Sequence, residues 1–229
     1  YRDEIVPYLA ALAEDCHAEG CAVMIQLTHL GWRTNWNKGD WLPVVAPSSV
    51  REPAHRSFPK EMEQWDIDRI IADYASAAQR MQAAGLDGIE LESYGHLMDA
   101  FWSPYQNRRE DAYGGSLDNR MAFTWAVIDA IRASVGSDFI VGIRMVADEQ
   151  FDKGIDRATG TEIAGRIARS GKFDFINLIR GRVATDAELT NVIPVQGMAS
   201  APHLDFAGEI KQAVDFPIFH ASKISDVAT

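Results

Sequence analysis

The sequence is short of cysteine and contains no long hydrophobic run. Its only two cysteines, Cys16 and Cys21, lie five positions apart, a spacing that does not match known metal-ligand patterns. We therefore expect no metal site, and two ordinary buried thiols in a reducing compartment, which favours the cytoplasm. Apolar stretches such as 139–143 fall far short of the roughly 18 residues that a membrane span needs, so we expect no membrane segment.

Positive charge is also scarce. Lys+Arg number 22 against 33 for Asp+Glu, and the formal net charge is −11. A protein that binds nucleic acid needs a basic face to neutralise phosphates, so we expect no nucleic-acid partner. With 47% hydrophobic and 24% charged residues among its 229, the composition is typical of a globular protein and excludes disorder. We expect one large domain over residues 1–229.

Short apolar segments alternate with longer amphipathic ones. Five segments lack polar alternation, as expected for parallel strands covered on both faces: 22–27, 88–91, 139–143, 173–179 and 216–219. Apolar residues at helical spacing predict helices at about 4–19, 66–84, 117–135, 160–170 and 203–214. Four glycines that follow helices are expected to end them with a positive φ: Gly20, Gly85, Gly136 and Gly171. This alternation predicts an α/β fold.

Two connections, about 29–65 and 93–116, are long, and both follow a strand. Long loops after strands are where an α/β barrel places its active site. Five β/α units cannot close a barrel of eight, and the chain opens on Tyr1 without a signal peptide or initiator methionine, so we expect an incomplete barrel. A doubly wound open sheet is the alternative, although no Gly-x-Gly-x-x-Gly follows any of the five segments.

Residues 107–120 read Asn-Arg-Arg-x-Asp-x-Tyr-Gly-Gly-Ser-Leu-x-Asn-Arg. Supporting motifs occur in order along the chain: Gln-Leu-x-His-x-Gly at 26–31, Ala-Gly-Leu-Asp-Gly-Ile-Glu at 84–90, Phe-x-Ser-Pro at 101–104 and Gly-Ile-Arg at 142–144. Together they resemble the old yellow enzyme family of FMN-dependent oxidoreductases over essentially the whole chain. The resemblance implies a (β/α)8 TIM barrel that binds FMN, of which this sequence carries about strands 3 to 7.

Two further motifs, Glu-Ser-Tyr-Gly-His-Leu at 92–97 and Ala-Pro-x-Leu-x-Phe-Ala-Gly at 201–208, look closest to the amine-oxidising branch of that family. This branch implies a small N-methylated amine or amino acid as substrate, hydride transfer from the N-methyl carbon to flavin N5, and release of formaldehyde. It also implies an electron-acceptor protein or NAD(P)H as redox partner and an iron–sulfur cluster in a C-terminal region not present here. Separately, we expect a homodimer.

The resemblance assigns cofactor contacts to Gln26, Arg144, Ser222 and Lys223. Gln26 would bond the pyrimidine edge of the flavin, although a surface glutamine at a strand end is the alternative. Arg144 ends an apolar strand, where a buried guanidinium needs a partner, and a cation there would stabilise the reduced flavin. Its alternative is an ion pair with a nearby acid, Asp148 or Glu149. Ser222 and Lys223 match phosphate-binding positions where the family usually has Gly and Arg.

Glu92, Tyr94 and His96 are the candidate catalytic residues. Alkene-reducing members of the family carry two polar residues here that polarise a carbonyl, followed by a proton-donating Tyr, and this segment is one residue shorter. An ionised Glu92 would instead hold a cationic amine, with Tyr94 as an aromatic face and His96 positioning the substrate. The alternative is a Glu92–Arg pair with Tyr94 packed in the core.

Two other activities stay open. One is an NAD(P)H-dependent ene-reductase that uses His96 or Tyr94 as proton donor. The other is an inactive barrel fragment without a complete FMN site.

Substrate-binding residues are expected in the first long loop, which carries His29, Trp32, Trp36 and Trp41. Tryptophans provide the strongest faces for a cationic amine, but they could equally seal the barrel top or a subunit interface. For His29, the alternative is a structural role facing a helix.

We interpret the 107–120 segment as structural, with cap and turn residues leading into the following helix. Its arginines, Arg108, Arg109 and Arg120, are expected to pair with local acids.

Overall fold

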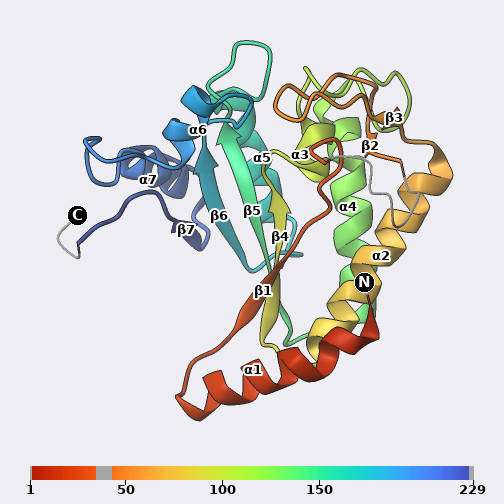
Figure 1. Cartoon of the computed structure of the whole chain (residues 1–229), viewed down its shortest axis with the longest axis vertical. Coiled ribbons are helices and arrows are strands. Elements are labelled where there is room, and N and C mark those ends of the chain that lie inside the picture. Colours follow the sequence, from red (N-terminus) through yellow and green to blue (C-terminus); the bar gives the residue numbers. More distant parts are fainter. Residues whose placement is uncertain (1, 35–42, 227–229) are drawn as a thin grey trace.

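The computed structural model, which describes residues 2–34 and 43–226, contains a five-stranded parallel sheet (Figure 1). Its strands are β1 (Met24–Leu27), β4 (Gly88–Ser93), β5 (Ile140–Asp148), β6 (Phe175–Arg180) and β7 (Ile218–His220). Each strand pairs with the next one along the chain, in the order β1-β4-β5-β6-β7. This sequential order is that of a β/α barrel, whereas the order reverses in a doubly wound sheet. The chain is therefore a partial TIM barrel.

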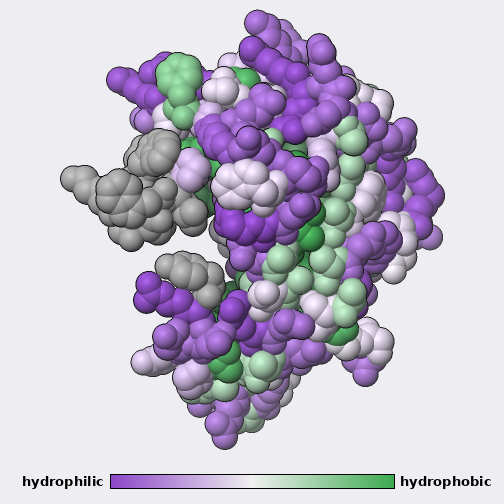
Figure 2. Space-filling view, turned by 90° about the vertical axis from the view of Figure 1, so that its right-hand side faces the viewer, coloured by the Kyte–Doolittle hydropathy of each residue, from purple (hydrophilic) through white to green (hydrophobic). Residues whose placement is uncertain are grey.

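The five predicted helices are present, with ends shifted by a few residues: α1 (Val6–Ala18), α2 (Gln64–Ala83), α4 (Leu117–Ser134), α5 (Arg157–Arg169) and α7 (Leu204–Val214). α2 packs on α4, and α5 packs on β5 and α7. The side of the molecule that carries α2 is mostly hydrophilic, with a band of apolar residues between the polar areas (Figure 2). Among the described residues, no helix is both long and apolar enough to cross a bilayer.

Several short elements were not predicted from the sequence: the 3-10 helix Asp3–Ile5, the two-residue strands β2 (Val45–Ala46) and β3 (Lys60–Glu61), α3 (Leu97–Trp102) and α6 (Asp186–Val192). All six residues of α3 are buried. A helix buried on every side has no amphipathic period, so its pattern does not distinguish it from a loop.

Two detailed expectations were wrong. Gly20, Gly85 and Gly171 have φ of 74°, 78° and 66°, as predicted, but Gly136 does not have a positive φ, because the extended residue Val135 already ends α4. The two cysteines are free thiols as expected, but they are not buried: Cys16 is half-buried and Cys21 is exposed.

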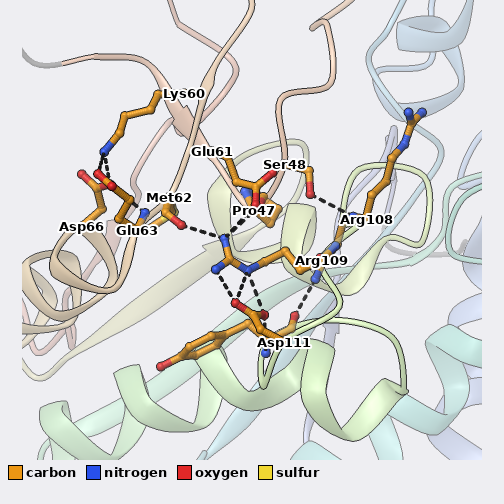
Figure 3. Close-up of polar contacts among 12 residues, drawn as sticks. Pro47, Ser48, Lys60, Glu61, Met62, Glu63, Asp66, Arg108, Arg109 and Asp111 are labelled. Carbon is orange, nitrogen blue, oxygen red and sulfur yellow. Dashed lines mark hydrogen bonds and ion pairs between the residues drawn. The ribbon is translucent and has the colours of Figure 1, made fainter.

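Arg109, in the 107–120 segment, is the centre of a group of polar contacts that joins two loops (Figure 3). The Arg109 guanidinium donates to the carbonyl oxygens of Pro47 and Met62, at 3.1 and 2.7 Å, and also to the Asp111 carboxylate. It thereby fastens the long loop after β1 to the loop before α4. The expected acid pairing is confirmed for Arg109 but wrong for Arg120, which donates to the carbonyls of Trp102 and Gly115.

Arg108 does not pair with an acid within the described residues either. Its backbone N–H donates to the Ser48 hydroxyl at 2.9 Å, and its guanidinium lies 5.9 Å from the centroid of the Tyr105 ring. The 107–120 motif thus has a structural role, because its arginines bind backbone carbonyls and side chains of the neighbouring loops.

Candidate active site

The two faces of the sheet differ in chemistry. On β4, the outward-facing Ile89, Leu91 and Ser93 are fully buried beneath the helices. The alternate residues Glu90 and Glu92 point to the opposite face, because successive side chains of a strand alternate. Register places polar residues of the neighbouring strands on that same face. We call it the lumen face; its polar residues are Gln26, Glu90, Glu92, Arg144 and Asn177.

Glu90 connects three strands across the lumen face. Its Oε1 accepts from Gln26 Nε2 of β1 at 2.7 Å, and its Oε2 accepts from Asn177 Nδ2 of β6 at 2.9 Å. Each side-chain amide donates one of its two N–H bonds to Glu90, and its oxygen can still accept from a ligand. The Asn177 Oδ1 is buried and has no partner within the described residues. The sequence predicted Gln26 here, but Glu90 and Asn177 were missed.

Arg144 lies half-buried on the lumen face of β5, directly opposite Glu92 in the strand register. It forms no ion pair within the described residues. The alternative of a structural pair is wrong, because Asp148 binds Arg180 at 3.0 Å and Glu149 accepts from the Ser103 hydroxyl and the Ile155 N–H. A half-buried guanidinium without a counterion fits an anionic or electron-rich ligand.

Glu92 and His96 lie together where β4 leads into α3. The Glu92 Oε2 is 3.7 Å from His96 Nδ1, and their side chains are 15% and 16% exposed. Glu92 does not pair with an arginine within the described residues, so that alternative is wrong. His96 Nδ1 is also 2.6 Å from the Tyr94 carbonyl oxygen. A carbonyl only accepts, so neutral His96 carries its proton on Nδ1 and leaves Nε2 as an acceptor.

Tyr94 borders a pocket of about 430 Å³, including its open mouth. The pocket lies between the loops that follow β1, β4 and β6. The hydroxyl of Tyr94 is buried without a partner in the described residues. Burial raises its pKa, an effect that the charges of Arg33 and Arg144 oppose. Its ring packs partly against the core, so Tyr94 combines a packing role with a free phenol at the pocket.

The structure brings only one of the substrate-binding candidates to this pocket. Trp32 lines it, 6% exposed, and packs on Ala46 and Val50. His29 instead lies against α2, where the Tyr74 hydroxyl contacts its backbone N–H at 3.1 Å. Burial lowers the pKa of His29 to about 4. The other two loop tryptophans, Trp36 and Trp41, fall outside the described residues.

The candidate phosphate contacts follow β7. Ser222 has φ 139°, in the region that favours glycine, and its hydroxyl is buried without a partner in the described part of the chain. This is consistent with a position where the family usually has Gly. The ammonium of Lys223 is engaged by the Val195 carbonyl at 2.8 Å and by the Met198 carbonyl. The Lys223 charge is therefore held within the chain.

Comparisons with known proteins agree with this architecture. A family model described as NADH:flavin oxidoreductase / NADH oxidase family matches residues 1–227. A probable N-methylproline demethylase of Rhizobium meliloti (strain 1021) is 61% identical over 100% of this chain and 34% of its own length. An N,N-dimethylglycine/sarcosine dehydrogenase of Chromohalobacter salexigens is 42% identical over 98% of this chain and 32% of its own length.

A solved 2-naphthoyl-CoA reductase superposes with a TM-score of 0.87 at 24% identity, covering 98% of this chain and 36% of that one. At that identity the likeness shows the fold alone. The chain spans about a third of the length of the curated relatives it matches. The resemblance to the old yellow enzymes and their amine-oxidising branch is confirmed.

The family implies FMN as cofactor, and the lumen face is suited to it. Arg144, which has no ion pair among the described residues, matches the electron-rich pyrimidine edge of a flavin. The amide oxygens of Gln26 and Asn177 can accept from the N–H donor of that edge. The family uses NAD(P)H and small-molecule substrates. The fold, the unpaired lumen residues and the match over residues 1–227 lead to one conclusion: this chain belongs to the NADH:flavin oxidoreductase / NADH oxidase family of FMN-dependent oxidoreductases.

Proposed function

We propose that the protein carrying this sequence oxidises the N-methyl group of a small amine or amino acid and releases it as formaldehyde. The observation that carries this proposal is Glu92, a carboxylate on the lumen face, 15% exposed and without an arginine partner among the described residues. A half-buried carboxylate of this kind attracts a cationic amine. The two relatives support the proposal, because both of their names refer to N-methylated amino acids.

The amine must lose its ammonium proton before it is oxidised, because its lone pair forms the new C=N bond. Burial lowers the pKa of His96, with Arg33 acting in the same direction and Glu92 opposing it. A neutral His96 with a free Nε2 can accept that proton while Glu92 holds the amine. FMN supplies the acceptor for the hydride that leaves the N-methyl carbon. Water then adds to the iminium ion, and the demethylated amine and formaldehyde separate.

Anaerobic absorption spectroscopy of the full-length protein tests this function. N-methylproline should bleach the flavin absorbance and release one formaldehyde per flavin. Glu92→Gln should lower the rate of bleaching at limiting substrate by about 10- to 100-fold, the loss expected for one charge-assisted contact. Ser93→Ala is the matched control, since Ser93 is the next residue along β4 but faces the helices, and it should keep the wild-type rate.

An ene-reductase is the second candidate, and the Tyr94 hydroxyl favours it. This buried phenol has no partner among the described residues, and its raised pKa keeps it protonated as a proton donor. If this is the activity, NADPH bleaches the flavin rapidly and N-methylproline does not. A colourless 229-residue chain beside a yellow full-length protein would instead support the inactive-fragment alternative.

The iron–sulfur cluster and the homodimer stay predictions. The two cysteines of this chain cannot supply a cluster with four thiolates. Iron analysis and sedimentation of the full-length protein test the cluster and the dimer separately.

A further inference from the structure

The pocket beside Tyr94 contains a cation, Arg33, to which the proposed demethylation assigns no contact with the substrate. Arg33 follows β1, and its Nη1 donates to the carbonyl oxygen of Val183, which follows β6, at 2.8 Å. This bond joins two loops that both line the pocket. Nε and Nη2 of Arg33 make no hydrogen bond within the described residues. Arg33 is half-buried, so it presents unused donors to a partly desolvated space.

The other arginine that lines the pocket, Arg182, differs from Arg33 because its charge is paired. Arg182 is paired with Glu188 at 3.0 Å, and its guanidinium lies 3.9 Å from the centroid of the Phe151 ring. Its charge and its flat face both have partners. Arg33 makes no ion pair anywhere in the described ranges, 2–34 and 43–226. Such a guanidinium needs an anion to offset its lost hydration.

The carboxyl groups that line the pocket do not supply this anion, because each is already engaged. Asp99 accepts from the backbone N–H groups of Gly95 and His96 at 2.7 and 2.9 Å. Glu52 accepts from the backbone N–H of His55, and Glu149 has the hydroxyl and N–H partners described above. None of these three forms an ion pair with Arg33.

Arg33 and Glu92 shift the pKa of the same side chain, His96, in opposite directions. The charge of Arg33 lowers the pKa of His96 further after burial, whereas Glu92 raises it. The geometry agrees: a Cβ on Gly95, the residue before His96, would stand 3.8 Å from Arg33 Nη1, and Glu92 Oε2 is 3.7 Å from His96 Nδ1. A cation and an anion therefore both lie close to the 95–96 segment. A small amino acid carries the complementary pair, an ammonium and a carboxylate separated by one carbon.

We propose that Arg33 binds the carboxylate of the substrate, so that this site selects zwitterionic N-methyl amino acids over simple N-methyl amines. The inference rests on the proposed function and narrows its substrate class. Two unused donors of one guanidinium match the two oxygens of a carboxylate. The bond to Val183 fixes the guanidinium before substrate binds, which reduces the entropy lost on binding.

N-methylproline and N-methylpyrrolidine test this in the full-length protein, because they share the reacting N-methyl ring and differ in the carboxylate. Wild type should favour N-methylproline in kcat/KM by about 10- to 100-fold, the worth of a charge-assisted contact. Arg33→Gln should remove most of that preference by slowing N-methylproline alone. Arg33→Lys, which keeps the charge but not the fork, should retain part of it. Arg51→Gln, an exposed arginine of the same loop, should change neither rate.

Proline binding provides a readout that does not depend on turnover. Proline has the carboxylate and no N-methyl group, so it should perturb the flavin spectrum of wild type and bind about 10- to 100-fold more weakly to Arg33→Gln. If neither amine is oxidised yet proline binds through Arg33, the demethylase function is lost and the carboxylate site stands. If N-methylproline is oxidised with the same preference in both Arg33 variants as in wild type, the carboxylate site is wrong and the function stands. If Arg33→Gln fails to retain flavin, Arg33→Lys decides the question by the same two assays.

Discussion

The two faces of strand β4 show how one segment serves stability on one side and chemistry on the other. Toward the helices, Ile89, Leu91 and Ser93 are completely buried. Toward the lumen, Glu90 and Glu92 remain half-buried and hold polar or charged partners. A side chain on the outer face is surrounded by protein, so packing determines it. A charge on the lumen face is incompletely paired within the chain, which indicates that a ligand completes it.

The largest effect should come from the outer face. Leu91→Ala leaves a cavity among fully buried neighbours and should lower the free energy of unfolding by about 2 to 5 kcal/mol. Urea unfolding of the full-length protein measures it. Met24→Ala on β1 is the control, because Met24 is already 40% exposed and its loss should cost about 1 kcal/mol or less. Equal losses for the two variants would contradict the difference between the faces.

The difference between faces explains what the sequence could predict. The strands were predicted because each is a short apolar run without polar alternation. The helices were predicted because buried apolar residues recur at helical spacing, as Ile67, Ile70 and Tyr74 do on α2. The buried α3 was missed because it lacks that period. Register across strands is also absent from a single sequence, so the contact of Glu90 with Gln26 and Asn177 could not be predicted.

His29 should give the next largest effect. It was expected to bind substrate, but it lies against α2 instead. Burial holds its pKa at about 4, below the ordinary value of 6.5, so folding opposes its protonation. The stability it contributes is complete above pH 6.5 and is lost as the pH falls toward 4, by about 3 kcal/mol. His29→Asn, whose amide oxygen can still accept from the Gly31 N–H, should remove this acid-dependent loss.

Urea unfolding at pH 7 and at pH 4.5 measures the difference for wild type and for His29→Asn. An unchanged KM for the amine in the variant would agree with a structural role. A raised KM, with the same pH dependence of unfolding in both proteins, would return His29 to the substrate site.

Arg144 tests the lumen face directly. Arg144→Met keeps much of the side-chain length and removes the charge, so it should weaken FMN binding by about 1.5 to 3 kcal/mol, the range for hydrogen bonds to charged groups. Flavin fluorescence on dilution of the full-length protein measures the dissociation constant. Stability of the apoprotein should change little or increase, because the mutation removes a half-buried charge that has no counterion in the described part of the chain. Unchanged FMN affinity, or an apoprotein that unfolds readily, would assign Arg144 to structure.

Some residues of the candidate site could be predicted from the sequence and others could not. Arg144 could be predicted because a charge at the end of an apolar strand is unusual in sequence alone, and Glu92 because it lies in the 92–97 motif. Arg33 could not, since an arginine in a long loop is ordinary until the structure shows that it forms no ion pair with the residues described. The local signal that could have pointed to it is its place two residues after the glycine of the Gln-Leu-x-His-x-Gly motif at 26–31.

Substitution of Ser93 should give the smallest effect. It separates the roles of the two faces of β4, because it should change stability and leave activity unchanged. Its hydroxyl is fully buried on the helix side of β4, with no partner in the described residues. A buried hydroxyl without a hydrogen bond is a cost to folding, so Ser93→Ala should stabilise the protein by about 1 kcal/mol. Urea unfolding detects this, and amine-dependent flavin reduction should stay at the wild-type rate although Glu92 is the adjacent residue. A destabilised variant would mean that the hydroxyl has a partner such as water, and a slower reduction would mean that the helix face of β4 also controls the chemistry of the lumen.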